Sequence, residues 1–320
     1  MNLSELTTLR LGGPARSLAT CDKESELVDA ARSGAFLLGG GSNVVLPDEG
    51  LDDVALVRTA CWSEHGDAVT ADAGLTWDEV VVRTLDAGRT GLEAMSGIPG
   101  TVGAAPIQNI GAYGAEVASF ISSVRVLDRR TGQVADVPGS ECGFSYRTSI
   151  FKRTPDRWVV LAVELSLATT EFPVRYAELA RVLGVEVGAS APPRAVREAV
   201  LALRRSKGMV LDPDDPDSVS AGSFFTNPLV RVAPEGAPSW PDPSGLRKVS
   251  AAWLIEQSGF TKGWGTGRIG LSSKHTLALV NRGGGTTAEL LGVAREIRAG
   301  VRARFGITLE NEPVIVGASL

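Results

Sequence analysis

The segment that most constrains the fold is SGIPGTVGAAPIQNIGAYG, residues 96–114, in which five residues are glycine and none is charged. Isoleucine, valine and tyrosine stand between the glycines, so the segment would be poorly suited to a solvent-exposed loop. Glycine also lets a backbone come close to another group, because it has no Cβ. We therefore expect one of two arrangements. The segment either wraps against a large, flat, partly apolar ligand, oriented by hydrogen bonds from Ser96, Gln108 and Asn109, or it forms a buried crossover of the chain.

A second glycine-rich loop lies nearer the N-terminus. Gly39-Gly40-Gly41-Ser42-Asn43 follows a short apolar run at residues 35–38, so we expect a strand that leads into the loop. Consecutive glycines allow backbone N–H groups to converge on an anion such as phosphate. Taken alone, the loop is also explained as a tight turn between a strand and a helix. Two such loops, about fifty residues apart, together indicate a nucleotide cofactor.

Three better-known motifs are incomplete or absent. A formal GxGxxG occurs at residues 265–270, but a helix is expected before it and a strand after it, the reverse of a dinucleotide-binding turn. The phosphate-binding pattern GxxxxGK[ST] is missing. Ser223 in AGSFFTNP lacks the GxSxG context of a hydrolase nucleophile, and a serine hydrolase would need His275 as its base.

Composition excludes several classes of protein. The 320 residues are 43% hydrophobic and 22% charged with a net charge of −5, which is typical of a globular chain and argues against nucleic-acid or membrane-surface partners. We expect no secretory signal at the N-terminus, and no stretch approaches the ~20 apolar residues needed to cross a bilayer. Cys21, Cys61 and Cys142 are scattered and only two histidines occur, so we expect a cytoplasmic protein without a metal cluster.

The local patterns predict a mixed α+β fold. Helices are expected over about 24–32 and 195–205, near 251–257, and after capping boxes at Thr76/Glu79 and Thr286/Glu289, with glycines at 34, 88 and 306 as stops. The cluster at residues 204–207 is interpreted as the basic last turn of a helix. Strands are expected at 35–38, 54–58, 68–73, 158–168 and 275–281, with a hairpin over 123–137. A change of composition after Thr169 suggests a domain boundary.

Nine stretches in order carry a family resemblance: TTLRLGGPA, GGGSNVV, GIPGTVGAAPIQNIGAYG, FSYRTSIFK, RRSK, AGSFFTNP, AAWLIEQSGF, SSKHTLALVN and LENEPVIVG. From about residue 7 to 317, the chain resembles the UDP-N-acetylenolpyruvoylglucosamine reductases. The resemblance implies an FAD-binding domain of the vanillyl-alcohol-oxidase type at 1–168, with subdomains at about 1–60 and 61–168. An α/β substrate-binding domain would follow at 169–320.

The resemblance also implies an activity. The family uses bound FAD and the co-substrate NADPH to reduce UDP-N-acetylglucosamine enolpyruvate to UDP-N-acetylmuramate, a precursor of bacterial peptidoglycan. We expect a cytoplasmic monomer whose partners are these two substrates, with no nucleic acid and no membrane. The alternatives are another flavin oxidase or dehydrogenase of the same fold, or a non-catalytic module that binds a nucleotide sugar.

The implied cofactor contacts lie in the two glycine-rich loops. Arg10, in TTLRLGG, is either close to the cofactor or an ordinary surface arginine. The residues that match the family's FAD contacts are Gly40, Gly41, Ser42, Asn43, Ser96, Gly97, Ile98, Pro99, Gly100, Gly103, Asn109, Gly111, Ala112, Tyr113 and Gly114.

The reaction dictates the types of catalytic residue. Adding hydride to an alkene beside a carboxylate requires a cation for the developing charge and an acid that protonates the adjacent carbon. Arg147 matches the family's cation, Glu312 its polarising glutamate and Ser223 its proton donor. The family usually has Glu-Val where this chain has Glu312-Pro313, and proline restricts the preceding backbone. Glu310 is therefore an alternative to Glu312.

Four further residues match positions around the family's substrate. Lys207 and Asn227 match contacts to the sugar-diphosphate part, and Tyr176 matches a tyrosine on a loop that closes over the diphosphate. As an alternative, Tyr176 occupies an ordinary packing position of an amphipathic segment. His275 belongs to the family's Lys-His motif and is placed near the site without an assigned chemical role.

Overall fold

The computed structural model describes residues 1–171 and 173–320, and these divide into two compact units. The terminal unit contains both chain ends: Met1–Ala15, Gly41–Leu51 and Ser206–Leu320. The central unit is formed by Arg16–Gly40 and Asp52–Arg205. These units are cut differently from the predicted domains, because residues 1–15 and 41–51 join the C-terminal part and 169–205 join the earlier part. Which ligand each predicted domain binds stays a prediction.

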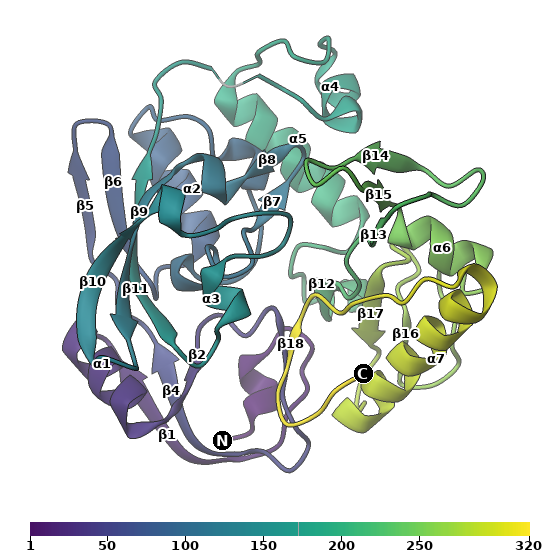
Figure 1. The fold of residues 1–320 in the computed structure, drawn as a ribbon, viewed down its shortest axis with the longest axis horizontal. Coiled ribbons are helices and arrows are strands. Elements are labelled where there is room, and N and C mark those ends of the chain that lie inside the picture. Colours follow the sequence, from purple (N-terminus) through teal and green to yellow (C-terminus); the bar gives the residue numbers. More distant parts are fainter. Residues whose placement is uncertain (172) are drawn as a thin grey trace. The chain divides into compact units, whose positions relative to one another are not determined.

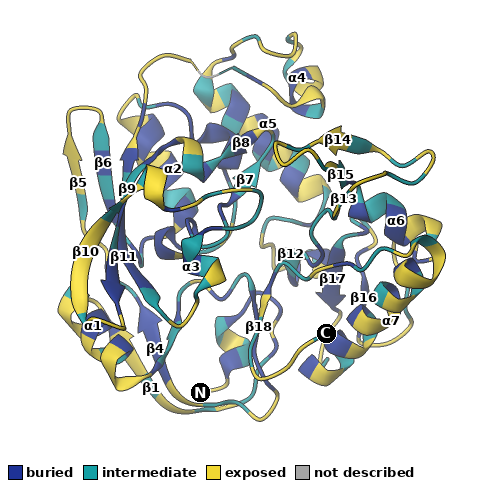
Figure 2. Ribbon diagram, in the orientation of Figure 1, coloured by how far each residue is buried: buried dark blue, intermediate teal, exposed yellow. Residues whose placement is uncertain are grey.

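A five-stranded antiparallel sheet is the centre of the central unit (Figure 1). The strand order is β10 (Gln133–Pro138), β9 (Ile121–Asp128), β11 (Trp158–Ser166), β6 (Ala68–Asp72) and β5 (Trp62–His65). The predicted hairpin is confirmed as β9 and β10, with Gln133 opposite Asp128. Figure 2 shows the consequence of this order: the middle strand β11 is mostly buried, whereas the edge strands β10 and β5 are mostly exposed.

Strand β11 packs on both of its faces. Val163 and Leu165 belong to one core together with helix α2 (Trp77–Asp86), and Val159 and Leu161 belong to another with helix α1 (Glu24–Ser33). Side chains alternate between the faces of a strand, so a nearly continuous apolar sequence is what burial on both faces requires. A register irregularity between Val160 and Ala162 interrupts the alternation.

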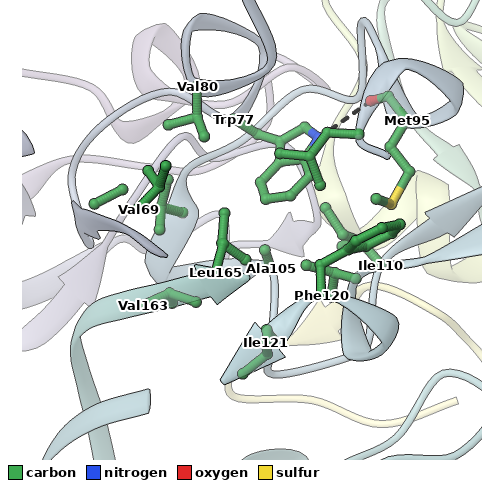
Figure 3. Packing of buried hydrophobic residues seen from close by; sticks show 14 of the residues in the cluster. Val69, Trp77, Val80, Met95, Ala105, Ile110, Phe120, Ile121, Val163 and Leu165 are labelled. Carbon is green, nitrogen blue, oxygen red and sulfur yellow. Dashed lines mark hydrogen bonds between the residues drawn. The ribbon is translucent and has the colours of Figure 1, made fainter. Parts of the chain in front are cut away.

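The glycine-rich segment contributes to the larger of these cores, as Figure 3 shows. Ala105 and Ile110 lie among the labelled residues, close to Trp77, whose indole N–H donates to the Met95 carbonyl over 3.1 Å. Val102 is fully buried in the same cluster. The side chains of Val102, Ala105 and Ile110 therefore pack inside the unit, as expected for a buried crossover, and whether the segment also contacts a ligand stays a prediction.

A second sheet of the central unit has the order β1 (Ala15–Cys21), β4 (Leu51–Val57), β2 (Phe36–Leu38). Strand β2 runs parallel to β4, and α1 ends at Gly34, whose φ of 87° suits glycine. The other elements of this unit are short apart from α5: β7 (Gly111–Ala112), β8 (Ala115–Glu116), α3 (Ile150–Arg153), α4 (Ala177–Leu183), α5 (Pro193–Ser206), and 3₁₀ turns at Glu93–Met95, Val102–Ala104, Val117–Ser119 and Gly139–Glu141.

The terminal unit is built on three small sheets. They are β12 (Ser220–Ser223), β17 (Ala278–Asn281) and β16 (Ile269–Leu271); then β13 (Leu229–Val230), β15 (Arg247–Val249) and β14 (Ser239–Pro241); and finally β18 (Val314–Ile315) parallel to β3 (Val44–Val45). Helices α6 (Ala251–Gln257) and α7 (Thr287–Phe305) supply much of its core, and 3₁₀ turns lie at Leu3–Leu6 and Pro216–Ser218.

The predicted helix signals act as expected in α7 and only in part in α2. In α7, Thr286 and Glu289 form both bonds of the capping box, and Gly306 ends the helix with a φ of 68°. In α2, Thr76 accepts the N–H of Glu79, while the Glu79 carboxylate contacts Arg83 instead of the helix end. The box at residue 76 is therefore half formed.

Three exclusions can be compared with the structure. The GxGxxG at residues 265–270 follows α6 and runs into strand β16, which confirms that it is not a dinucleotide-binding turn. Within residues 1–171 and 173–320, no helix has the length and apolar character to cross a bilayer. In the same residues, no three His, Cys, Asp or Glu side chains gather as a metal site would require.

Candidate active site

The structure distributes the candidate residues over both units. The terminal unit contains Gly41, Ser42, Asn43, Lys207, Ser223, Asn227, His275 and Glu312. The central unit contains Gly40, all candidates between residues 96 and 114, Arg147 and Tyr176. Each group is described within its own unit.

Ser223 is the last residue of β12, directly opposite Ala278 of β17. The next residue continues the pairing, because the N–H of Phe224 donates to the Leu277 carbonyl over 2.7 Å. The Ser223 hydroxyl oxygen lies 3.5 Å from Nε2 of His275. The rings of Phe224 and Phe225 pack edge to face in the core, each 1% exposed. The phenylalanines are therefore structural, and the half-buried serine is the functional candidate of this stretch.

His275 is held by a compact turn. The Ser272 hydroxyl accepts the N–H groups of Lys274 and His275 over 3.0 and 3.1 Å, and the His275 carbonyl accepts the N–H of Ala278. Burial, reinforced by the nearby positive charge of Lys207, lowers the pKa of His275 to about 4. The imidazole is therefore neutral at pH 7.

Ser223 and His275 are the residue types of the first two members of a hydrolase triad, but the third member, a carboxylate, is missing from this pair. A catalytic base of that kind is oriented by a carboxylate on its other ring nitrogen. Among residues 1–171 and 173–320, no carboxylate hydrogen-bonds to His275, and Glu256 accepts the hydroxyl of Thr276 instead. The geometry does not favour serine hydrolysis.

Glu312 lies beside the residue that follows Ser223. Its N–H donates to the Phe224 carbonyl over 2.8 Å, and the side-chain amide of Asn43 donates to the Glu312 carbonyl over 3.4 Å. The N–H that Pro313 lacks is not needed here, because the N–H of Val314 donates to the Asn43 carbonyl. Glu310 is exposed, whereas Glu312 is half-buried. This geometry favours Glu312 over Glu310.

The loop at residues 41–43 is fixed to the same region of the terminal unit. Thr8 donates through its N–H to the Gly41 carbonyl over 3.0 Å, and through its hydroxyl to the Ser220 carbonyl of β12 over 2.7 Å. Gly41 has a φ of 61°, and a Cβ added there would lie 1.9 Å from the Leu6 carbonyl oxygen. Only glycine fits this position.

In the central unit, Gly40 meets the other glycine-rich loop. A Cβ on Gly40 would lie 2.7 Å from the Cα of Gly100, so the two backbones touch without intervening side chains. Within the described part of the chain, the N–H groups of Gly40 and Gly100 donate to no acceptor. Backbone N–H groups gathered in this way form an anion-binding concavity.

Two polar side chains of residues 96–114 are used inside the unit. Ser96 is fully buried and its hydroxyl donates to the Glu93 carbonyl over 2.7 Å. Asn109 is 1% exposed; its amide donates to Glu116 and to the Ser145 carbonyl, and its oxygen accepts an N–H. These contacts hold the loop in place, and the expectation that the two side chains orient a ligand stays a prediction. Contact through their backbone stays a prediction.

Arg147 also braces the glycine-rich segment. Its guanidinium donates to the Gly111 carbonyl over 2.8 Å and to the Asn109 carbonyl over 3.3 Å, and it lies 5.4 Å from the Tyr146 ring centre. These contacts place a permanent positive charge at residues 109–111.

Unusual backbone conformation marks the same segments. Four non-glycine residues of the described chain have positive φ: Arg10 (51°), Asn109 (48°), Tyr113 (49°) and Arg147 (52°). Side chains with a Cβ rarely adopt this conformation, and where it persists it tends to occur at functional sites. All four residues are candidates from the sequence, although no local pattern identifies their backbone conformation.

The sequence reasoning missed a charged brace on the other side of Gly97. Asp78 accepts the Gly97 N–H over 2.6 Å and pairs with Arg197 over 2.6 Å. Arg204 donates to the Gly97 carbonyl and is 8% exposed. The basic cluster at 204–207 is thus more than a helix end, since its first arginine is buried against the loop. The signal for it lies on α5, where Arg197 and Arg204 are seven residues apart and share one face.

The remaining substrate candidates have distinct surroundings. Tyr176 is 43% exposed and meets the Tyr113 ring edge to face at 5.5 Å between centres. Burial raises the pKa of Tyr113 to about 12. In the terminal unit, Asn227 accepts the N–H of Ala251 at the start of α6, over 2.9 Å. Lys207 is close enough to His275 to disfavour its protonation.

The comparisons with known proteins define the class first. Residues 17–137 match the model of an FAD binding domain, and residues 214–316 match the model described as "UDP-N-acetylenolpyruvoylglucosamine reductase, C-terminal domain". The chain is thus an α+β flavoprotein of the FAD-dependent oxidoreductases, as predicted. A UDP-N-acetylenolpyruvoylglucosamine reductase of Thermobifida fusca is 51% identical over 347 aligned positions, covering 99% of this chain and 97% of the relative. One of Streptomyces avermitilis is 50% identical, covering 99% and 94%.

The solved structures agree. The crystal structure of UDP-N-acetylenolpyruvylglucosamine reductase from Thermus caldophilus matches with a TM-score of 0.69 at 26% identity, covering 98% of this chain and 97% of that one. The chain belongs to the UDP-N-acetylenolpyruvoylglucosamine reductase family, which confirms the resemblance found in the sequence.

The residues present fit the FAD that this family uses. The cofactor carries a diphosphate, for which the N–H groups of Gly40 and Gly100 are available donors, and a Cβ on Gly40 would push the two loops apart. Asp78 and Arg204 hold the loop at the N–H and the carbonyl of Gly97, and Arg147 holds it at the carbonyl of Gly111.

Proposed function

We propose that this protein reduces UDP-N-acetylglucosamine enolpyruvate to UDP-N-acetylmuramate at the expense of NADPH, for peptidoglycan synthesis. When bound, FAD would supply the hydride-transfer chemistry that links NADPH to the outer carbon of the substrate's alkene. The roles of the chain's own residues follow from the charge that this creates. Negative charge grows on the substrate beside its carboxylate, and a proton must reach the adjacent carbon.

The observation that carries the proposal is the grouping around Ser223 in the terminal unit. Ser223 and Glu312 are joined through one residue, since the Glu312 N–H binds the Phe224 carbonyl. The imidazole of His275 faces the serine hydroxyl at 3.5 Å. A serine hydroxyl beside a neutral imidazole, with the backbone of Glu312 bound to the residue that follows the serine, suits proton delivery to carbon. We assign the donated proton to Ser223 and the polarising role to Glu312.

We assign the substrate carboxylate to Arg147. A guanidinium can bind a carboxylate through two parallel hydrogen bonds and stays charged at every physiological pH. Its contacts with the Asn109 and Gly111 carbonyls hold it in one orientation, and its positive φ is a strain that the surrounding unit supports.

We assign the sugar diphosphate to Lys207, Asn227 and Tyr176. Lys207 supplies a compact positive charge for phosphate oxygens. Tyr176 is exposed and its ring meets Tyr113 edge to face, which suits a side chain that folds over a ligand. We also place His275, which belongs to the terminal unit, near these substrate-binding residues.

We place the enzyme in the cytoplasm as a monomer, without nucleic-acid or membrane partners. NADPH and nucleotide sugars are cytoplasmic metabolites, each catalytic role has a residue in a single chain, and the net charge of −5 does not favour nucleic acid. Light scattering of the purified protein tests the oligomeric state.

Rapid mixing of the two half-reactions tests the function. Anaerobic NADPH should bleach the flavin absorbance, and the enolpyruvyl sugar nucleotide should then restore it with formation of UDP-N-acetylmuramate. UDP-N-acetylglucosamine, which lacks the alkene, is the control and should leave the flavin reduced. A protein that stays colourless after incubation with FAD, or a reduced flavin that the enolpyruvyl substrate does not reoxidise, would overturn the proposal.

A further inference from the structure

We infer that His275 is a positioning residue for Ser223, and that its Nε2–H donates a hydrogen bond to the serine oxygen and so directs the serine's own hydrogen toward the substrate. This inference rests on the proposed function, because it explains how a hydroxyl group, a weak acid, can protonate carbon there. It adds a residue whose contribution acts through Ser223.

Strand pairing fixes the distance between the two side chains. Ser223 is opposite Ala278, and the N–H of Phe224 donates to the Leu277 carbonyl, so β12 holds the start of β17 in register. The turn that carries His275 precedes β17 directly. The separation of 3.5 Å between Ser223 Oγ and His275 Nε2 is therefore set by backbone hydrogen bonds.

The turn itself is anchored at several points. Asp217, 8% exposed, accepts the Ser273 N–H over 2.9 Å, and Lys274 pairs with Asp215 over 2.8 Å. The buried Ser272 hydroxyl accepts the N–H of His275. The backbone that carries His275 is therefore fixed relative to β17.

Chemistry decides which group donates. A neutral imidazole has a single N–H, and a serine hydroxyl has a single hydrogen. If Nε2 accepted that hydrogen, Ser223 would have none to give to the substrate. The productive tautomer therefore carries its hydrogen on Nε2 and donates to Oγ. This bond strengthens as the serine oxygen becomes negative, so it favours loss of the proton.

The surrounding charges support the neutral form. Lys207 and Lys262 disfavour a second proton on the ring, while Glu256, which favours one, is engaged by Thr276. The same two lysines favour negative charge on the serine oxygen.

The proton balance needs no further reactant. The O–H bond of Ser223 breaks as a C–H bond forms at the carbon next to the substrate carboxylate. The serine oxygen regains a proton from water when the product leaves, and His275 keeps its own hydrogen throughout.

A double-mutant cycle on the holoenzyme tests the inference. His275→Ala should slow reoxidation of the reduced flavin by the enolpyruvyl sugar nucleotide roughly 10- to 100-fold, the range for losing one hydrogen bond to a developing charge. His275→Gln, whose amide N–H reaches as far as Nε2, should stay within about 3-fold of wild type, and the shorter His275→Asn should be as slow as His275→Ala. Ser223→Ala combined with His275→Ala should be no slower than Ser223→Ala alone. Flavin reduction by NADPH is measured in every variant, so that the reoxidation rates can be compared relative to it.

Three results would overturn the inference. His275→Ala could slow the Ser223→Ala variant as much as it slows wild type, which would show that His275 acts directly on the substrate. His275→Ala could have no effect, or His275→Asn could match His275→Gln, a comparison that remains available if the alanine variant does not fold. Failure of the proposed function looks different, since the wild-type flavin itself would then not be reoxidised.

Discussion

Two regions differ in which part of the residue is available for function. They are the glycine-rich segment of the central unit and the end of strand β12 at Ser223 in the terminal unit. In the segment, the side chains of Ser96 and Asn109 hydrogen-bond to neighbouring parts of the unit, and we propose its backbone as the ligand-facing element. At Ser223 the backbone is paired with β17, and we propose the side chain as the functional element. Substitutions in the two regions should therefore have different effects: loss of folding and cofactor in the first, loss of chemistry alone in the second.

The largest effect should come from Ser223→Ala. A positioned acid contributes roughly 10²–10⁴-fold to rate, so we expect reoxidation of reduced flavin by substrate to slow about 10³-fold, about 4 kcal/mol in the activation free energy. Unfolding and flavin reduction by NADPH should be unchanged, because Ser223 is only half-buried. Rapid-mixing absorbance measures both steps, and the exposed Ser244→Ala is the control. An equal loss in both half-reactions would contradict the assigned role.

Gly41→Ala should be nearly as severe but should act on folding. The new Cβ would meet the Leu6 carbonyl oxygen at 1.9 Å in a backbone with positive φ. We expect about 4 kcal/mol of lost stability, measured by urea unfolding. Gly66→Ala is the matched control, since Gly66 has a φ of 59° and open space around its Cβ position, and it should cost about 1 kcal/mol. Similar losses at both positions would refute the steric explanation.

Asn109→Asp tests whether the glycine-rich segment depends on its inward side chains. The substitution removes the amide donor to Glu116 and the Ser145 carbonyl and places a carboxylate beside another. We expect the free energy of unfolding to fall by about 3 kcal/mol and FAD to be retained less tightly. Flavin fluorescence after dilution measures the release of FAD. An unchanged stability with slower hydride transfer would instead indicate that Asn109 contacts the ligand.

The smallest effect concerns pH. The pKa of His275 falls from about 6.5 in the unfolded chain to about 4 in the folded one, chiefly through burial. Between these values the unfolded chain binds the extra proton, so wild-type stability should fall as pH falls from 6.5 to 4 and be unaffected by this group above 6.5. For a half-buried ring we expect about 2 kcal/mol. His275→Gln should remove that part of the pH dependence of stability, which urea unfolding at pH 4.5 and 7 measures. If the free energy of unfolding falls equally in both proteins between these pH values, the prediction is contradicted.

Local elements could be predicted because short-range forces form them. The helix over 251–257, the hairpin of β9 and β10, and the capping box with its Gly306 stop in α7 appear as expected, since each depends on residues within a few positions of one another. The half-formed box of α2 shows the limit: Glu79 has a second local partner in Arg83, and the pattern does not decide between them. The two-residue strands such as β3 and β18 carry no period that sequence could reveal.

The candidate site divides in the same way. The sequence alone determined which residues could do the chemistry, through nine motifs whose residue types suit FAD, a carboxylate and a proton donor, and it determined where glycine was required. Tertiary structure decided that Ser223 meets His275 across 52 positions, that Glu312 sits beside Phe224 despite Pro313, and that Ser96 and Asn109 face inward. It also decided that Arg147 and Tyr113 adopt positive φ. The reason is physical: a residue's type and its immediate neighbours restrict its local conformation, whereas its partners and direction depend on long-range pairing of strands and loops, which no local pattern contains.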